Sequence, residues 1–397
     1  MIHSLNLLAA WSLALVWLWS AVRAGFGMSK LAELTQPQWD IPAAEIVTPA
    51  GKRTPRVSII VPARNEAATI EPALRSLLEL DYPNYEIIVV NDRSTDRTGE
   101  IVDVIASDAS AQGRVTVVHV RELPPRWLGK THAMWTAGQR ATGDWLLFTD
   151  ADVHQRPDAL RRCLAYAQRE RADHVVLLPT VVMESVGERM MIAFFQAPFV
   201  FAHRPWKVAD PKSKDHMGVG AFNFIRRDVY EALGTYERMR LAVVDDMQLG
   251  ALVKQHGYAQ RNVFGRDLVR IRWAHGAFGM VRNLNKNLFA EFRYNVAMSA
   301  AAFIGLLALN LPPFLGVIFA RGWAWPGYAL ALACIFGLYV GMSKRSTISP
   351  LYIFLHPVST VLMAGAIVNS TVSALWRGGI VWRGTLYPLS ELRSSLR

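Results

Sequence analysis

Long uncharged apolar stretches stand at both ends of this chain, and they constrain its fold more than any other feature. Leu5 to Val22 carries no charged residue and is long enough to cross a bilayer once. Two or three comparable stretches follow from Val296 onward, and together they explain a hydrophobic content of 52%. The sequence therefore predicts membrane segments within residues 1–30 and 296–376, and it leaves the middle of the chain to form a water-soluble domain.

The first apolar stretch is interpreted as an uncleaved anchor. A cleaved leader is the alternative, but no Lys or Arg precedes the stretch, and Arg23 lies inside the would-be cleavage site. Because Arg23 and Lys30 follow the stretch, the positive-inside rule places the middle of the chain in the cytoplasm.

The last apolar stretch, Leu351 to Trp376, leaves two topologies open. A full crossing would place the basic tail, residues 377–397, outside, against the positive-inside rule. His356-Pro357 would instead break the stretch into a re-entrant or interfacial segment and return the tail to the cytoplasm. We expect the second arrangement.

Charge and cysteine content exclude several classes of protein. The net charge of +11 fits a domain that lies against an anionic membrane surface. Nucleic-acid binding is the alternative, but the chain has no basic run with interleaved aromatic residues. Cys163 and Cys334 are the only cysteines, so a disulfide framework and a cysteine-based metal site are both excluded.

Strands and helices alternate in the middle of the chain. Residues 31–55 carry four prolines without periodicity and are expected to be a linker. The alternation that follows is typical of an α/β fold with a doubly wound parallel sheet. The expected strands are 56–61, 85–90, 115–120 and 144–149, and the expected helices are 67–80, 94–105 and 131–140.

Polar residues follow three of these strands at the point where each strand ends. Asn65 and Glu66 follow the first strand, Asp92 ends the second, and Asp150 and Asp152 end the fourth. The carboxyl ends of parallel strands share one edge of the sheet, where ligands bind in such folds. Asp150 and Asp152 are two residues apart and project to the same side, so they suit Mg²⁺ or Mn²⁺ holding a diphosphate.

Each of these residues also has an ordinary explanation. Asp92 precedes Ser-Thr and would serve as a helix cap, and an Asp-Ala-Asp turn would cap the helix after Pro157. Lys130 leads into a helix and would reach a phosphate, or it is a solvated surface lysine. Gly129-Lys130-Thr131 lacks the upstream glycine of a P-loop, which excludes a Walker-type ATPase.

The second half of the domain carries two further motifs. Gly218 and Gly220 lie in a turn that enters a strand, and they would let backbone approach a ligand closely. Asp245 and Asp246 stand together at a helix start, where acidic residues also stabilise the helix dipole.

Three segments, taken in order, resemble the nucleotide-binding half of family 2 glycosyltransferases with the GT-A fold. They are Val57-Ser-Ile-Ile-Val-Pro62-Ala-Arg64-Asn65-Glu66, Ile88-Val-Val-Asn-Asp92-Arg-Ser-Thr-Asp96 and Phe148-Thr-Asp150-Ala-Asp152. The resemblance covers residues 56–295 and implies a GT-A domain, a nucleotide-diphospho-sugar donor, Mg²⁺ or Mn²⁺, and inversion at the anomeric carbon.

The resemblance also implies roles for single residues. Asp92 matches the uridine contact, and Asp152, with Asp150, matches the diphosphate and metal contact. Asp246, the second acid of its pair, matches the catalytic base and is preferred over Asp245. The remaining assignments are Pro62, Arg64, Asn65, Glu66 and Lys130 on the donor side, and Gly218 and Gly220 on the acceptor side.

One family motif is incomplete. Membrane-bound relatives often have Gln or Arg, two residues, and then Arg-Trp before the next membrane segment. Here Arg272-Trp273 follows Val269, and Arg293-Tyr294 follows Ala290. Trp273, Lys286 and Arg293 are therefore only candidates for this motif, with Trp273 and Arg293 assigned to the acceptor side, and processive polymerisation loses support.

The resemblance to lipid-modifying members implies a multi-pass protein of the bacterial inner membrane that moves a sugar, we expect from a UDP-sugar, to a hydroxyl of a membrane lipid. Transfer to a polyprenyl phosphate and a catalytically inactive membrane scaffold are the alternatives. The apolar stretch Met190 to Phe201 would lie in the membrane interface and admit a lipid, or it is an ordinary core helix.

Overall fold

The computed structural model describes residues 2–395 except 48–50, 52–53 and 112. The chain divides into two compact units. The α/β unit comprises Leu31–Val182 and Pro205–Arg272, and the apolar-helix unit comprises Met1–Lys30, Met183–Arg204 and Trp273–Arg397. Residues 48–50 and 52–53 of the expected linker and Arg397 of the basic tail lie outside the described residues.

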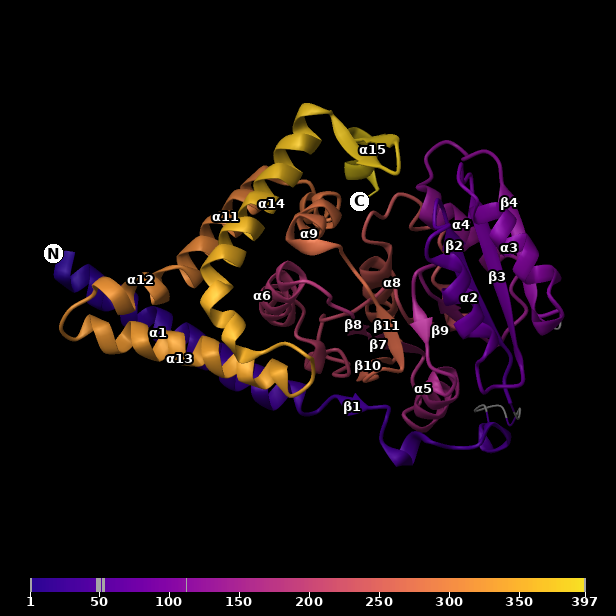
Figure 1. Cartoon of the computed structure of the whole chain (residues 1–397), viewed down its shortest axis with the longest axis horizontal. Coiled ribbons are helices and arrows are strands. Elements are labelled where there is room, and N and C mark those ends of the chain that lie inside the picture. The colour runs from indigo at the N-terminus through magenta and orange to yellow at the C-terminus, as the bar shows by residue number, and fades with distance from the viewer. Residues whose placement is uncertain (1, 48–50, 52–53, 112, 396–397) are drawn as a thin grey trace. The chain divides into compact units, whose positions relative to one another are not determined.

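An eight-stranded sheet forms the centre of the α/β unit (Figure 1), in the order β1-β10-β7-β9-β5-β2-β3-β4. Neighbouring strands are parallel, except that β9 runs antiparallel to both β5 and β7. A small second sheet has the order β6-β11-β8. The strands are β1 (Ala32–Glu33), β2 (Val57–Ala63), β3 (Tyr85–Asp92), β4 (Val115–Val120), β5 (Trp145–Phe148), β6 (His154–Gln155), β7 (His174–Leu178), β8 (Thr180–Val181), β9 (Asn223–Arg226), β10 (Gln260–Phe264) and β11 (Val269–Ile271).

Helices cover both faces of the large sheet, as expected for a doubly wound fold. Successive residues of β2 point to opposite faces, so Ile59 and Ile60 belong to two different hydrophobic cores. The Ile59 core includes residues of α2, α3 and α5, and the Ile60 core includes residues of α4, α7 and α8. The helices are α2 (Ile70–Leu78), α3 (Thr98–Ser107), α4 (Gly129–Gly138), α5 (Ala159–Arg169), α7 (Arg227–Ala232) and α8 (Asp245–Gln255).

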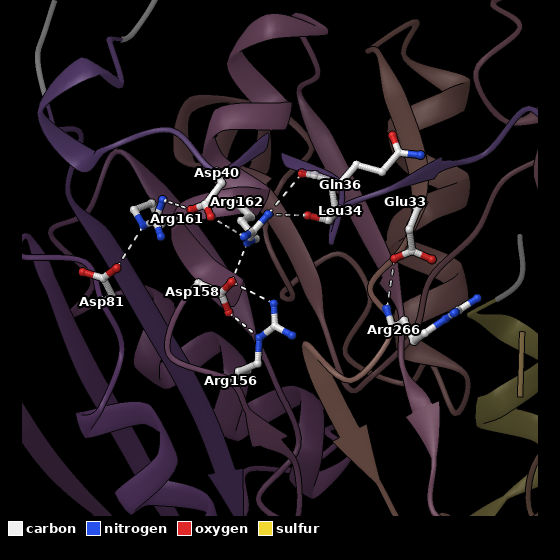
Figure 2. A network of polar contacts seen from close by, with 10 residues as sticks. All are labelled: Glu33, Leu34, Gln36, Asp40, Asp81, Arg156, Asp158, Arg161, Arg162 and Arg266. Carbon is white, nitrogen blue, oxygen red and sulfur yellow. Dashed lines mark hydrogen bonds and ion pairs between the residues drawn. The ribbon is translucent and has the colours of Figure 1, made fainter. Parts of the chain in front are cut away.

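The segment before the sheet is packed onto it instead of forming a free linker. β1 pairs with β10, and Trp39 is 4% exposed. Figure 2 shows the polar contacts that hold this segment: Arg162 donates to the carbonyls of Leu34 and Gln36 and pairs with Asp40 at 2.6 Å. Pro37 and Pro42 therefore stand at the starts of short 3-10 turns on the edge of the domain, a difference that proline content alone does not reveal.

The apolar-helix unit contains four helical segments that are long and apolar enough to cross a membrane: His3–Met28, Val296–Phe319, Ala324–Ser343 and Pro350–Trp376. The expected membrane segments coincide with them. The elements of this unit are α1 (Ile2–Met28), α6 (Val186–His203), α9 (Gly276–Asn285), α10 (Leu288–Glu291), α11 (Val296–Asn310), α12 (Pro312–Phe319), α13 (Ala324–Ser343), α14 (His356–Trp376), β12 (Gly379–Trp382), β13 (Thr385–Pro388) and α15 (Leu389–Ser394).

Helix α6 belongs to the apolar-helix unit and not to the core of the α/β unit. Ser185 and Glu188 form a capping box that fixes its start. Ser359 of α14 donates to the carbonyl of Met190, and Phe194 packs against His356. Residues Met190 to Phe194 are buried by such contacts inside the apolar-helix unit, and the interfacial interpretation of the Met190 to Phe201 stretch stays a prediction.

Candidate active site

Lys130 lies at the centre of a cluster of carboxyl groups in the α/β unit. Its Nζ is 2.8 Å from Asp150 Oδ1 and 3.6 Å from Asp245 Oδ1. Burial would lower the pKa of Lys130, but Asp150, Asp245 and Asp246 together raise that pKa above its usual value. Lys130 is thus a charged counter-ion for the acids around it, and the alternative of a solvated surface lysine does not hold.

The loop before β9 closes around this cluster at two glycines. The Asp150 amide donates to the carbonyl of Gly220 at 3.1 Å. A Cβ on Gly220 would lie 3.2 Å from Lys130 Nζ, and a Cβ on Gly218 would overlap the backbone of Asp246. The glycines are therefore required here because other parts of the protein come so close, which is a different reason from the ligand approach expected from sequence.

Asp150 and Asp152 lie directly after β5, as the strand pattern predicts. Burial is the main reason why the pKa of Asp152 rises to about 7, and the negative charges of Asp150 and Glu66 add to the effect. Neither Asp150 nor Asp152 caps α5, whose N-cap position is Asp158. The ordinary explanation as a capping turn therefore fails.

The chemistry of these residues fits a divalent ion. Closely spaced acids that oppose each other's ionisation are relieved by a divalent cation, and Mg²⁺ or Mn²⁺ commonly uses one or two carboxylates together with phosphate oxygens. Across the described residues, no three His, Cys, Asp or Glu side chains converge to hold an ion without a ligand's help. Asp152, with Asp150, would hold the ion, and substrate phosphate would complete its ligands.

Asp92 is 3% exposed and ends β3 at the same edge of the sheet. Arg93 donates to both of its carboxylate oxygens, at 2.7 and 3.0 Å. A Cβ on Gly129 would overlap Asp92 Oδ2, so the start of α4 lies against this carboxylate. Asp92 is not the cap of α3, because Asp96 accepts from the Thr98 amide there.

Asp245 and Asp246 begin α8 but occupy different surroundings. Asp245 is 3% exposed and faces Lys130. Asp246 is less buried, and its Oδ1 accepts from the Met247 amide at 2.8 Å. Of these two acids Asp246 is the more accessible to a substrate, and its preference as the base stays a prediction.

The other predicted donor-side residues have structural contacts. Pro62 is buried in β2 opposite Val90. Asn65 accepts from the Thr95 amide at 2.8 Å, and this contact joins the loops that follow β2 and β3. Glu66 lies close enough to Asp152 to affect its pKa. Arg64, at the end of β2, is partly buried.

Two predicted acceptor-side residues lie in the apolar-helix unit. Trp273 packs edge-on against Phe195 of α6, with ring centroids 4.8 Å apart. Arg293 is exposed, has a φ of 52°, and directly precedes the buried Tyr294. Their role toward the acceptor stays a prediction.

Sequence reasoning missed Arg93 and His132. His132 is 8% exposed in α4; burial lowers its pKa, while Asp92 acts in the opposite direction. Its Nδ1 is buried and has no hydrogen-bond partner among the described residues. The sequence offered one signal for His132: it stands three residues after Gly129, and residues three apart in a helix face the same side.

The carboxyl ends of the strands in this sheet thus carry several acids and one lysine counter-ion in a small space. Residues 58–234 match the model of glycosyl transferase family 2. The α/β unit thus contains a family 2 glycosyltransferase domain, the resemblance seen in the sequence is confirmed, and the protein is a glycosyltransferase.

Relatives support this class. The chain is 27% identical over 258 residues to the probable glycosyltransferase YdaM of Bacillus subtilis (strain 168), covering 62% of this chain and 57% of that protein. It is 21% identical over 341 residues to 4,4'-diaponeurosporenoate glycosyltransferase of Staphylococcus aureus (strain MRSA252), covering 84% of this chain and 89% of that protein.

A solved structure shares the fold. A mannosyltransferase from Pyrobaculum calidifontis, in complex with GDP-Man and Mn²⁺, superposes with a TM-score of 0.54 at 21% identity. The match covers 94% of this chain and 99% of that one. The expected GT-A architecture is therefore confirmed.

Proposed function

We propose that this protein is an inverting glycosyltransferase that moves a sugar from a nucleotide-diphospho-sugar, with UDP-sugars favoured, to a hydroxyl of a membrane lipid. The observation that carries the proposal is the cluster of Asp150, Asp245 and Asp246 around Lys130, next to Asp152 and beside the tip that holds Asp92. The likeness to a carotenoid glycosyltransferase and the four apolar helical segments support a lipid acceptor.

In this mechanism the donor binds along the carboxyl edge of the sheet. Asp92 accepts a hydrogen bond from the nucleoside, and the ammonium of Lys130 faces the diphosphate. A divalent ion held by Asp152 and Asp150, when bound, supplies further neutralisation of the departing nucleoside diphosphate.

Asp246 acts as the general base. It takes the proton from the acceptor hydroxyl while that oxygen attacks the anomeric carbon from the face opposite the diphosphate. The new carbon–oxygen bond forms as the bond to the diphosphate breaks, so the configuration inverts. Asp245 keeps Lys130 in place and does not exchange a proton.

The test uses the full chain in a bacterial membrane host supplied with a panel of labelled nucleotide-sugars, followed by mass spectrometry of the lipid extract. We expect label in a hydroxyl-bearing lipid with the native chain and none with Asp246→Asn. Label on a polyprenyl phosphate that persists in Asp246→Asn would support the alternative, because a phosphate acceptor needs no base. Failure to bind any nucleotide-sugar in the presence of Mn²⁺ would support the inactive scaffold.

Topology is part of the same proposal. We place the catalytic unit in the cytoplasm of a bacterium, with several segments in the inner membrane, because basic residues follow the first span. A reporter fused after residue 395 tests the position of the tail: reporter activity restricted to the periplasm would contradict the cytoplasmic assignment.

A further inference from the structure

A small polar hollow lies within the apolar-helix unit where α9, α14 and β12 meet. Asn285, Lys286, Ser370, Ser373 and Arg377 line it, together with residues 379–381 at the start of the hairpin. No acidic residue belongs to its lining, so two cationic side chains and several neutral hydrogen-bonding groups face one small space.

The walls of the hollow are held together by specific hydrogen bonds. Ser370 Oγ donates to the Asn285 carbonyl at 2.5 Å and accepts from the Phe289 amide at 3.0 Å. Lys286 Nζ donates to Asn287 Oδ1 at 2.9 Å and lies 4.4 Å from the ring centroid of Trp382. These two contacts keep the cation of Lys286 at a fixed place in the wall.

Contacts among the apolar helices show how some of them run relative to one another. The indole Nε1 of Trp17 in α1 donates to the carbonyl of Leu309, while Ala10 clusters with Ala320, so the chain from the end of α11 through α12 runs antiparallel to α1.

The contacts of helix α13 show that it finishes at the same end of the unit as α1. Gly327 packs on Ala10, and Arg345 donates to the Met28 carbonyl at 3.0 Å, so α13 runs parallel to α1. Figure 1 shows α1 and α13 side by side. The basic residues Lys30 and Lys344 consequently stand at one end of the unit.

Helix α14 begins near this end, because His356 at its start is hydrogen-bonded to Tyr339, close to the finish of α13. His356 also contacts Asn310 at the end of α11, whereas Ser370, near the finish of α14, contacts Phe289, which precedes α11. The hollow therefore lies at the finish of α14, beside the segment that precedes α11. Trp376, which is 88% exposed, stands beside it at the point where the apolar sequence stops.

We propose that this hollow binds the phosphate group of an anionic phospholipid. Cations and hydroxyl donors in a water-accessible pocket favour phosphate, and the end of an apolar helix flanked by an exposed tryptophan lies at headgroup depth. A soluble phosphate, such as that of a nucleotide, has the same chemistry, so the two sources must be separated by experiment.

The hollow is distinguishable from ordinary helix capping. Lys286 and Arg377 occupy the C-cap positions of α9 and α14, where a positive charge offsets the negative end of the helix dipole. Capping alone needs neither a shared hollow nor a lining without acids. A cap also has no preference among lipids, which makes lipid selectivity the decisive readout.

The test measures lipids retained by the full chain in native mass spectrometry, after reconstitution in phosphatidylcholine nanodiscs with or without phosphatidylglycerol. The Lys286→Gln/Arg377→Gln double variant is compared with Arg282→Gln/Arg383→Gln, which removes the same charge from α9 and from the hairpin outside the lining. We expect retained phosphatidylglycerol to fall about tenfold or more only in the first variant.

Two further arms keep the proposal refutable. Lys286→Arg in the native background should retain selectivity, and Ser373→Asp, which places a negative charge in the hollow, should abolish it. Competition by UDP or inorganic phosphate would support the phosphate site and assign it to a soluble ligand, whereas no competition supports the lipid. Equal retention of both lipids by the native chain, or equal loss in both double variants, would overturn the proposal.

Discussion

The strongest test of the active site compares two neighbouring acids that receive the same substitution. In Asp246→Asn the amide oxygen can still accept from the Met247 amide, and Lys130 keeps its 2.8 Å contact with Asp150. The helix start and the charge cluster should therefore survive. Loss of a general base typically costs about 10²–10⁴-fold in turnover, and we expect that loss with donor affinity nearly unchanged.

Asp245→Asn should behave differently. A charge pair 3.6 Å apart has a gross attraction of ~5 kcal/mol at an effective dielectric constant of about 20. Much of this is offset because both groups lose hydration on burial, so we expect a net loss of ~1–3 kcal/mol in the free energy of unfolding. Donor affinity should fall as well, because Lys130 is then less firmly positioned.

The assay follows sugar transfer to the extracted lipid, with donor binding by calorimetry and unfolding of the full chain in detergent as parallel readouts. The assignment predicts a variant that binds but does not turn over, Asp246→Asn, and a variant that is less stable and binds weakly, Asp245→Asn. Near-normal turnover of Asp246→Asn on its lipid acceptor, or the reverse pattern between the two variants, would refute the reasoning.

Three further predictions concern the α/β unit. Burial lowers the pKa of His174 to about 4, so between pH 6.5 and 4 the unfolded chain binds a proton that the folded chain does not. The free energy of unfolding should therefore fall by up to about 3 kcal/mol as the pH decreases through this range. His174→Gln should flatten the curve of unfolding free energy against pH in the same range. Gly218→Ala should lower the unfolding temperature and turnover at a cost of ~1–3 kcal/mol, whereas Gly305→Ala, with nothing within 4 Å, should change neither. Arg162→Met leaves two carbonyls without their donor and leaves Asp158 with Arg156 as its partner, so chemical denaturation should show a loss of about 1–3 kcal/mol; an unchanged midpoint would contradict the role of this network.

The strand and helix pattern predicted the sheet well because its signal is local. The runs ending at Asp92 and Asp150 are short, apolar and β-branched or aromatic, and they form β3 and β5 where the pattern places them. The antiparallel insertion of β9 between β5 and β7 could not be predicted in this way. The position and direction of β9 depend on which strands pair in the folded protein. The alternation of side chains along a strand is the same for parallel and antiparallel strands, so the sequence pattern does not distinguish them.

The predicted linker, residues 31–55, differs from the expectation because much of it is packed onto the α/β unit. Four prolines without periodicity predict irregular backbone in residues 31–55. The described part of this segment is largely irregular, but it is nevertheless packed onto the domain. Arg162 binds two of its carbonyls, and Trp39 packs edge-on against Tyr166. Such contacts join residues more than a hundred positions apart, so no local pattern contains them.

From the sequence alone the acids of the candidate site and Lys130 could be singled out, but Arg93 and the pairing of Lys130 with particular acids could not. The acids can be recognised in the sequence because they stand where apolar strands end. The roles of Lys130 and Arg93 depend on which groups they contact in the fold. Lys130 faces Asp150 and two further acids at once, and one ammonium group cannot offset them and an incoming diphosphate. We expect a site built this way to discriminate against an anionic donor that arrives without a cation and to accept one that arrives with Mg²⁺ or Mn²⁺. The excess of carboxyl groups around Lys130 is thus the physical reason to expect metal-dependent donor binding.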